Sequence, residues 1–300
     1  MSQKAVHLEG MGVIGSVTAY RLREAGVPFT WSDGRVECNA YRASAGGVYP
    51  INTNVSHAAV HHNSCMAWIT AANVRAFGPS TTELCDYLYN TVSAPFGQSW
   101  KPVAKRGSLN LAPIPVVSVN TRQLVDVARA RFAAQEGPPE PDAKRFITHG
   151  FGPRLAAHGW GCTAVVEIAN EERIRDGATD TRPLLSLFAA RSMRLYVVPL
   201  PGTLFYVIGS TIRVAQQKPE TLDAKAADLS QRYRGMMRRL AGLDAIVHDV
   251  RQGWRPLAND ADAAPLRKVD GQTWAVRPAA GSGVAQAFDF AAAVVNEAKR

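Results

Sequence analysis

The pattern of apolar positions near the start of the chain predicts a strand, a helix and a second strand. The short apolar run Ala5–Leu8 is typical of a buried strand, and Val27–Trp31 predicts another. Between them apolar residues recur at roughly helical spacing, and Gly26 ends the run. The helical positions are Val13, Val17, Ala19, Leu22 and Ala25. This order favours an α/β protein.

Glycines fill the turn between the first strand and the helix. Gly10, Gly12 and Gly15 have the spacing G-x-G-x-x-G, and Asp33 follows 18 residues after Gly15 (33 − 15). Such glycines permit a tight turn and close approach to a pyrophosphate, and the helix N-terminus donates hydrogen bonds to phosphates. We therefore predict a dinucleotide site with Asp33 on a ribose hydroxyl; a turn-rich loop of another α/β protein is the alternative. Glu9 fits badly, because it brings a negative charge near the phosphates.

Helical and β-rich stretches alternate along the rest of the chain. Helices are predicted over 51–77, Thr121–Gln135 (with Asn120 or Thr121 as N-cap) and Leu222–Leu240. Gly137–Pro141 breaks the second helix. Strands are predicted over parts of 79–113, Arg145–Thr148 and most of 160–215.

Four segments, in this order and spacing, resemble the D-amino-acid oxidase-like flavoprotein family, which includes glycine and sarcosine oxidases. They are the glycine fingerprint, the Ser/Gly-rich loop Arg42–Pro50, the hairpin Tyr196–Pro199 with Phe205–Thr211, and Gly253–Pro256 followed by Gly281–Val284. The chain is short for this family, which implies a trimmed substrate domain. No cysteine follows Cys162, so the resemblance implies noncovalent FAD and not a flavin linked to a C-terminal cysteine.

The resemblance implies an α/β fold with two interleaved domains. One is a Rossmann-like FAD-binding domain, and the other is an α+β, mostly antiparallel β substrate domain. The chain is expected to cross between them more than once. The FAD-binding domain would comprise residues 1–78, 114–158 and 246–300, and the substrate-binding domain residues 79–113 and 159–245.

The resemblance also assigns residues to cofactor and substrate. Arg255, in the G-x-R-P match, corresponds to an arginine that clamps the substrate carboxylate, because its fork pairs both oxygens; a structural salt bridge is the alternative. Tyr206 either donates to the same carboxylate or packs as a strand aromatic. The strand that ends at His149–Gly152 is expected to approach FAD. The expected FAD-binding residues are Gly10, Gly12, Gly15, Asp33, Arg42, Ser44, Gly46, Gly47, Gly281, Ser282, Gly283 and Val284.

The chemistry implied by the resemblance requires few catalytic groups from the protein. The flavin takes a hydride from the carbon next to a neutral amine, the protein aligns that carbon, and the imine is hydrolysed. A glycine joined through its nitrogen to a large group would release glyoxylate and leave a primary amine. Gly46–Pro50 is similar to the flavin loop of the tRNA oxidase domain that trims carboxymethylaminomethyl-uridine. Related bacteriophage flavoproteins act on glycine-modified thymidine.

The charge of the chain bears on which substrate is expected. Lys and Arg total 34 against 25 Asp and Glu, a net charge of +9, which favours a polyanionic partner; a solvated basic face is the alternative. Three basic groups stand out: Lys101, Lys105 and Arg106; Lys144, Arg145 and Arg154; and Arg232, Arg234, Arg238 and Arg239 on a predicted helix, which we expect to bind nucleic acid.

We therefore predict an FAD-dependent oxidase or lyase of a glycine-like amine carried on a modified pyrimidine in nucleic acid. The first alternative is an oxidase of a free small amino acid such as glycine, sarcosine or a D-amino acid. The second is a non-catalytic binding module that kept the flavin-binding scaffold.

Other sequence features bear on membrane insertion, cellular location and metal binding. No run of 18 apolar residues exists, so no membrane span is expected. The cysteines form no C-x-x-C pair, which favours free thiols in a reducing compartment. Together with the resemblance to bacteriophage flavoproteins, this implies the cytoplasm of a bacterial or phage-infected cell. No metal is expected, because no second ligand pair with zinc spacing follows the predicted helical cluster His57, His61, His62 and Cys65.

Overall fold

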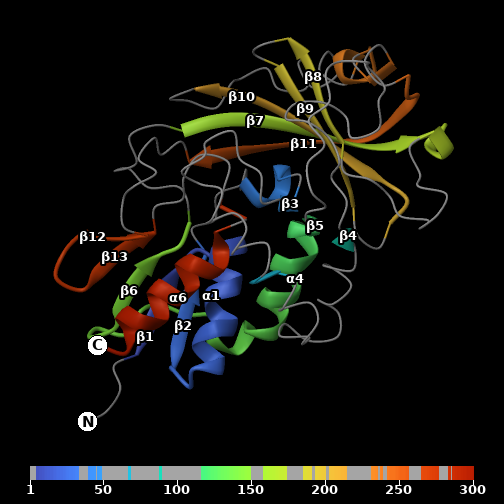
Figure 1. Cartoon of the computed structure of the whole chain (residues 1–300). Helices are drawn as coiled ribbons and strands as arrows, with labels where there is room; N and C mark the ends of the chain where they lie inside the picture. The colour runs from blue at the N-terminus through green and yellow to red at the C-terminus, as the bar shows by residue number, and fades with distance from the viewer. Residues whose placement is uncertain are drawn as a thin grey trace.

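In the computed structural model of the 300-residue chain, the strands formed by the described residues lie in two five-stranded sheets and a smaller three-stranded one (Figure 1). The structure describes residues 5–33, 40–44, 46–48, 67–68, 88–89, 116–149, 158–173, 185–190, 193–200, 203–214, 231–235, 237–238, 242–256, 265–276, 283–284 and 286–300.

The first large sheet is mostly parallel and has the strand order β12-β13-β6-β1-β2. Its strands are β1 (Val6–Glu9), β2 (Phe29–Ser32), β6 (Lys144–Ile147), β12 (Leu266–Lys268) and β13 (Thr273–Val276). β1 pairs in parallel with β2 and β6, and β13 pairs in parallel with β6, whereas β12 is antiparallel to β13. The predicted Rossmann-like unit is confirmed.

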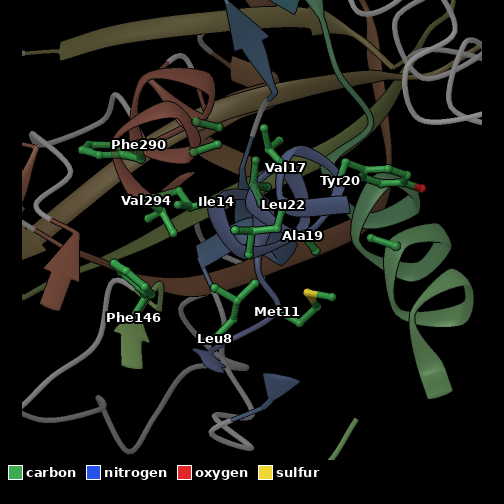
Figure 2. Packing of buried hydrophobic residues seen from close by; sticks show 14 of the residues in the cluster. Leu8, Met11, Ile14, Val17, Ala19, Tyr20, Leu22, Phe146, Phe290 and Val294 are labelled. Atoms are coloured by element: carbon green, nitrogen blue, oxygen red, sulfur yellow. The ribbon is translucent and has the colours of Figure 1, made fainter. Parts of the chain in front are cut away.

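Three helices pack together over this sheet: α1 (Val13–Glu24), α4 (Thr121–Arg131) and α6 (Ala287–Ala298). α1 packs against both of the others, and Figure 1 shows it between them. Its residues are therefore buried on several sides, including the small Gly15, Ser16 and Ala19. Figure 2 shows Leu8 of β1 and Phe146 of β6 with Ile14, Val17 and Leu22 of α1 and Phe290 and Val294 of α6 in this core.

The ends of these helices follow from local sequence. Gly26 adopts a φ of +68°, and its N–H bonds the carbonyl of Arg23, while Val27 N–H bonds that of Leu22. This is how glycine commonly closes a helix, so the predicted stop is confirmed. Asn120 caps α4 by accepting from the N–H of Gln123 at 3.3 Å. The helix predicted to Gln135 ends at Arg131, and a 3₁₀ turn, η4 (Ala133–Gln135), completes the segment.

The second large sheet is antiparallel throughout, with the strand order β11-β7-β10-β9-β8. Its strands are β7 (His158–Ile168), β8 (Leu185–Ala190), β9 (Met193–Pro199), β10 (Tyr206–Val214) and β11 (Ala245–Pro256). A separate hydrophobic cluster packs against it and includes Tyr206, Ile208, Tyr233 and Met237. Residues 231–235 and 237–238 are helical, in agreement with the predicted helix Leu222–Leu240, whose other residues lie outside the described ones.

Short elements connect the two large sheets. A small antiparallel sheet holds β3 (Gly47–Val48), β4 (Leu88–Tyr89) and β5 (Val116–Ser118), and two 3₁₀ turns are η1 (Ala40–Ala43) and η5 (Glu171–Arg173). η1 packs against α4 as well as against β7 and β11 (Figure 1). The loop that begins at η1 therefore lies where the two units meet.

The predicted fold class, a Rossmann-like unit with a mostly antiparallel β unit, is confirmed. The domain boundaries stay a prediction, although the two hydrophobic clusters draw on separate sets of strands. Among the described residues no helix is both long and apolar enough to cross a membrane. Cys162 is buried with a free thiol.

Candidate cofactor and substrate site

The glycine turn after β1 has three glycines with three different surroundings. Gly10 has a φ of +108°, and a Cβ there would lie 2.6 Å from the Cβ of His149. A Cβ on Gly15 would lie 2.0 Å from the carbonyl oxygen of Gly10. Gly12, the N-cap of α1, has no atom within 4 Å of its Cβ position. The outer two glycines are thus required by packing, whereas the middle one leaves open space at the start of the helix.

The helix start is suited to an anion. α1 has no side-chain cap and no acidic residue in its first turn, so neither competes with a ligand for its N-terminal N–H groups. Those groups and the helix dipole favour a phosphate. The open Gly12 position together with this uncapped start fits the pyrophosphate of a dinucleotide such as FAD.

Glu9, which fits the sequence prediction badly, has a counter-charge. Its carboxylate is paired with the guanidinium of Arg145, the second residue of the neighbouring strand β6. Its backbone carbonyl accepts from the N–H groups of Thr148 and His149 at 2.9 and 3.1 Å. The pairing offsets the negative charge beside the turn, and the backbone bonds bring the end of β6 against Gly10.

Thr148 holds the turn from the same side. Its hydroxyl donates to the carbonyl of Gly10 at 2.6 Å and lies 3.2 Å from that of Glu9. The Thr148–His149 end of β6 therefore lies against the glycine turn, whereas residues 150–152 of the predicted strand end lie outside the described part of the chain. Its approach to FAD itself stays a prediction.

Asp33 lies at the end of β2, where the sequence places a ribose-binding acid. Its carboxylate is paired with Arg129 of α4, and both side chains are about one-quarter exposed. The guanidinium of Arg129 also lies over the ring of Tyr41 at 5.6 Å. A carboxylate has more acceptor sites than one guanidinium fills, so this pairing orients Asp33 and leaves capacity for a hydroxyl.

The predicted flavin loop is tied to the small sheet. Gly46 has a φ of +69°, and a Cβ there would lie 1.9 Å from the carbonyl oxygen of Val119. Its N–H donates to the hydroxyl of Ser44 at 3.1 Å, and its carbonyl accepts from Val119 N–H at 2.9 Å. Gly46 is required for this close approach, and Gly47 continues into β3. Contact of this loop with a flavin stays a prediction.

The predicted C-terminal turn is described only in part. Gly281 and Ser282 lie outside the described residues, and Gly283 and Val284 form a turn ahead of α6. The indole N–H of Trp68 donates to the carbonyl of Val284 at 3.1 Å, and its ring packs edge-on against Phe288. Trp68, from the segment predicted to be helical over 51–77, therefore anchors this turn.

The two predicted substrate residues lie on the second sheet. Arg255 lies on β11 and pairs in register with Gly159 of β7; its side chain lies outside the described part of the chain. Tyr206 is fully buried, and its hydroxyl donates to Glu171 at 2.6 Å. A substrate carboxylate would therefore compete with Glu171 for that hydroxyl. The substrate roles of both residues stay predictions.

The predicted nucleic-acid residues lie on the helix that covers the second sheet. Tyr233 and Met237, four residues apart, are buried, and the Tyr233 hydroxyl donates to the carbonyl of Cys162 at 3.2 Å. Arg232, Arg234 and Arg238 are exposed, and Arg238 is paired with Asp244 at 3.1 Å. Arg239 and the cluster His57, His61, His62 and Cys65 lie outside the described residues. No group of possible metal ligands occurs among the residues that are described.

Sequence reasoning missed several residues that shape this site. Arg129 and Asp33 are 96 positions apart, and nothing in the local pattern links them. Tyr41, which precedes the predicted flavin loop, receives a hydrogen bond on its carbonyl from Thr121 at 2.7 Å. Thr148 was detectable in principle, because the carboxyl ends of neighbouring parallel strands converge at one edge of a sheet.

Comparisons with known proteins agree with this architecture. No protein-family model matches the chain, and no curated protein matches it by sequence. Among solved structures, glycine oxidase from Geobacillus kaustophilus superposes with a TM-score of 0.69 at 14% identity, over 99% of this chain and 95% of that one. Iminodiacetate oxidase from Chelativorans sp. BNC1 superposes with a TM-score of 0.65 at 15% identity, over 97% and 94%.

A third structure contains the cofactor that the sequence predicts. Glycerol-3-phosphate dehydrogenase from Bacillus halodurans, solved in complex with FAD, superposes with a TM-score of 0.57 at 11% identity, over 99% of this chain and 64% of that one. At such identities these likenesses establish the fold. The chain has the fold of the D-amino-acid oxidase-like FAD-dependent amine oxidoreductases.

Proposed function

We propose that this protein binds FAD noncovalently and oxidises a small amine that carries a carboxylate, of the glycine type. The observation that carries the proposal is the open Gly12 position at the uncapped start of α1. It is the space that a dinucleotide pyrophosphate needs, on a fold shared with amine oxidases.

Several residues of the chain would hold the cofactor. The first N–H groups of α1 would bind its pyrophosphate, and Asp33, oriented by Arg129, would accept from its ribose. Thr148 donates to the carbonyl of Gly10 and so helps to fix the turn that the pyrophosphate would approach. FAD, when bound, supplies the acceptor for a hydride from the substrate carbon, after which water hydrolyses the imine.

The second sheet would hold the substrate. In this proposal the Arg255 guanidinium pairs both oxygens of the carboxylate and fixes the α-carbon. β11 is hydrogen-bonded to β7 along its length and contacts η1, which leads into the predicted flavin loop. Such a rigid strand beside that loop suits a residue that must align a reacting carbon.

The test is spectroscopic and chemical. Purified protein is expected to be yellow, to release free FAD on acid precipitation, and to be bleached anaerobically by glycine, sarcosine or another N-substituted glycine. The keto acid formed from these substrates is glyoxylate. A colourless protein that does not take up FAD would overturn the proposal. A yellow protein that is bleached neither by these amines nor by a glycine-like amine attached to nucleic acid would instead favour the non-catalytic binding module.

A second candidate is the same reaction on a glycine-like amine attached to a modified pyrimidine in nucleic acid. The observation that favours it is the net charge of +9 together with exposed arginines on the outer face of the helix that contains Tyr233. A small amino acid does not need such a basic surface. If only free amines reduce the flavin, and single- and double-stranded DNA and RNA fail to bind at low salt, this candidate is excluded.

A further inference from the structure

The register of the second sheet places Arg255 and Tyr206 at positions of opposite faces. Residues paired directly across neighbouring strands share a face, and the face alternates along each strand. Arg255 pairs with Gly159 of β7, whereas Tyr206 pairs with Val166, an odd number of residues (166 − 159) further along the same strand. The face that carries Tyr206 packs against the helix that contains Tyr233. Arg255 therefore belongs to the other face.

The face that carries Arg255 is turned toward the predicted dinucleotide-binding unit. Arg255, Arg251 and Asp249 are alternate residues of β11 and share this face. The carboxylate of Asp249 lies 3.7 Å from an Nη of Arg122, in the first turn of α4. β7 and β11 also contact η1, which leads into the predicted flavin loop. A substrate between this sheet and a flavin would therefore lie over the face of Arg255 and not over that of Tyr206.

A stretch of this face consists of glycine. Gly159 and Gly161 are alternate residues of β7, and Gly253 of β11 pairs with Gly161. We call these three residues the glycine patch. Arg255 pairs with Gly159 at one end of the patch, and Thr163 follows Gly161 on the same face at the other end. Because glycine within a strand often marks a close approach of a ligand to the backbone, the patch suits a small bound molecule.

Thr163 has a buried hydroxyl whose hydrogen-bonding capacity is unused. The residue is fully buried, and its Oγ1 has no hydrogen-bond partner among the residues that the structure describes. Gly209 of β10 pairs with Thr163, and a Cβ on Gly209 would lie 2.7 Å from the Thr163 Cγ2. The methyl group thus lies against β10, and the hydroxyl takes another direction. An unsatisfied buried hydroxyl is unfavourable, and a polar group of a bound molecule would remove that cost.

The neighbouring arginine does not fill this role. Arg251 pairs in register with Thr163, but its Nε donates to Asp249 at 3.0 Å. Asp249 and Gly253 lie on opposite sides of Arg251 along β11, so the guanidinium is turned away from the glycine patch. Thr163 is therefore left as a polar side chain at the border of the patch.

We propose that the Thr163 hydroxyl binds the nitrogen of the substrate amine, with the substrate lying over the glycine patch. This step rests on the proposed function, in which Arg255 holds the carboxylate. Gly159, the partner of Arg255, and Thr163 are four residues apart on β7, roughly 13 Å between α-carbons. An extended arginine side chain, a glycine-type amine and one hydrogen bond together span such a distance.

The chemistry of a hydroxyl indicates the class of amine. A hydroxyl accepts a hydrogen bond from an N–H group and has no charge. It therefore does not favour the ammonium form, as a neighbouring carboxylate would, and it suits the neutral amine from which a hydride is taken. A neutral primary or secondary amine has an N–H to donate, whereas a neutral tertiary amine has none. The substrate class is thus a primary or secondary amine of the glycine type.

The first experiment removes the hydroxyl and keeps the shape of the side chain. FAD-loaded Thr163→Val is titrated anaerobically with sarcosine, followed by the bleaching rate, and with methylthioacetate, in which sulfur replaces the N–H, followed by the flavin spectrum. We expect sarcosine affinity to fall about three- to tenfold, while methylthioacetate affinity stays the same. Thr163→Ser should retain sarcosine affinity. Thr273→Val, at a buried threonine of the first sheet, is the matched control and should leave both affinities unchanged.

A second variant tests the glycine patch even if Thr163→Val folds poorly. Gly253→Ala places a methyl group on the patch, so it should weaken sarcosine and methylthioacetate alike. Thermal melts accompany both variants. Thr163→Val should not lower the melting temperature, because its hydroxyl has no hydrogen bond to a described residue to lose. A merely structural hydroxyl would predict a lower melting temperature and no selectivity between the two ligands.

The outcomes are distinct. A loss confined to sarcosine in Thr163→Val supports the proposal, as does a preference for sarcosine over N,N-dimethylglycine that narrows in this variant. Unchanged sarcosine affinity, or an equal loss for sarcosine and methylthioacetate, would overturn it. So would loss of bound FAD in Thr163→Val, which would assign the hydroxyl to the cofactor, or unchanged binding in Gly253→Ala. If no amine bleaches the unaltered protein, the proposed function itself fails, whereas equal bleaching of Thr163→Val and the unaltered protein overturns only the role of Thr163.

Discussion

Gly15 faces the carbonyl oxygen of Gly10 so closely that a Cβ atom on Gly15 would lie 2.0 Å from it. At Gly12, between them in the sequence, a Cβ would meet nothing within 4 Å. The glycines of one motif are thus required for different reasons. Gly15 serves the contact between α1 and the turn, whereas Gly12 leaves space that a ligand can fill.

This difference predicts opposite results for two alanine variants. Gly15→Ala should lower the free energy of unfolding by about 3 kcal/mol or more, because backbone must move. Gly12→Ala should cost about 1 kcal/mol or less, as expected for alanine at an N-cap, yet should lose FAD. Thermal melts of the FAD-free proteins and flavin absorbance per chain measure the two effects. Gly235→Ala, on an exposed helical position with open space, is the control and should retain both.

Features of this site that involve neighbouring residues were predictable from the sequence, whereas contacts between residues far apart in the chain were not. The glycine turn, the stop at Gly26 and the Asn120 cap are local, and each was predictable because a few neighbouring residues determine the backbone there. The pairings of Asp33 with Arg129 and of Glu9 with Arg145 join residues 96 and 136 positions apart. Strand order and helix packing decide which distant side chains meet, and no periodicity in one sequence encodes that.

The first and last residues of a strand were also less predictable than the presence of the strand. The strand predicted at Val27–Trp31 is observed at Phe29–Ser32, because Gly26 and Val27 are used to close α1 before the ladder with β1 begins. The pairing of Arg122 with Asp249 escaped prediction for a similar reason, because the two residues are distant in the sequence and meet only in the fold.

Tyr206 is the predicted substrate residue whose surroundings are described. Because its hydroxyl donates to Glu171 within a buried region, we expect Tyr206→Phe to lower the free energy of unfolding by about 1 kcal/mol and to leave the KM for the amine within twofold. Tyr233→Phe, which loses a bond to the Cys162 carbonyl, is the control. A large rise in KM in Tyr206→Phe alone would support the substrate role predicted for Tyr206.

His7 makes stability depend on pH. It is fully buried on β1 and bonded to the hydroxyls of Thr30 and Ser32 at 2.8 and 2.9 Å. Burial lowers its pKa, Glu9 raises it and Arg145 lowers it. The unfolded chain therefore binds a proton more readily than the folded one, so this contribution to stability is complete above the ordinary pKa of about 6.5 and is lost as the pH falls through the lower folded value.

The measurement is chemical denaturation across the mildly acidic range. The unfolding free energy should fall as the pH is lowered below about 6.5, and His7→Gln should have a shallower dependence than the unaltered protein. His248→Gln, an exposed histidine paired with Glu167, provides the comparison. Equal slopes for the unaltered protein and His7→Gln would show that protonation of His7 is not coupled to unfolding.

Arg255→Gln tests the proposed carboxylate clamp. Removing one partner of a hydrogen-bonded charge pair costs about 2–5 kcal/mol, so kcat/KM for a glycine-type amine should fall by at least one order of magnitude while FAD remains bound. Arg267→Gln, on the edge strand β12, should leave both unchanged. Near-normal turnover in Arg255→Gln would show that the arginine is structural and that another group binds the carboxylate.

The helix above the second sheet tests whether nucleic acid presents the amine. Arg232 and Arg234 are exposed, whereas Arg238 is held by Asp244 at 3.1 Å. Each phosphate neutralised on duplex DNA contributes about −0.9 to the slope of log affinity against log salt. Arg232→Gln/Arg234→Gln should therefore weaken binding to all sequences alike and make this slope less steep. Arg234→Gln alone is compared with Arg238→Gln, which should do less because its guanidinium is paired with Asp244. If these variants bind nucleic acid as tightly as the unaltered protein does, this helix is not the surface that contacts nucleic acid.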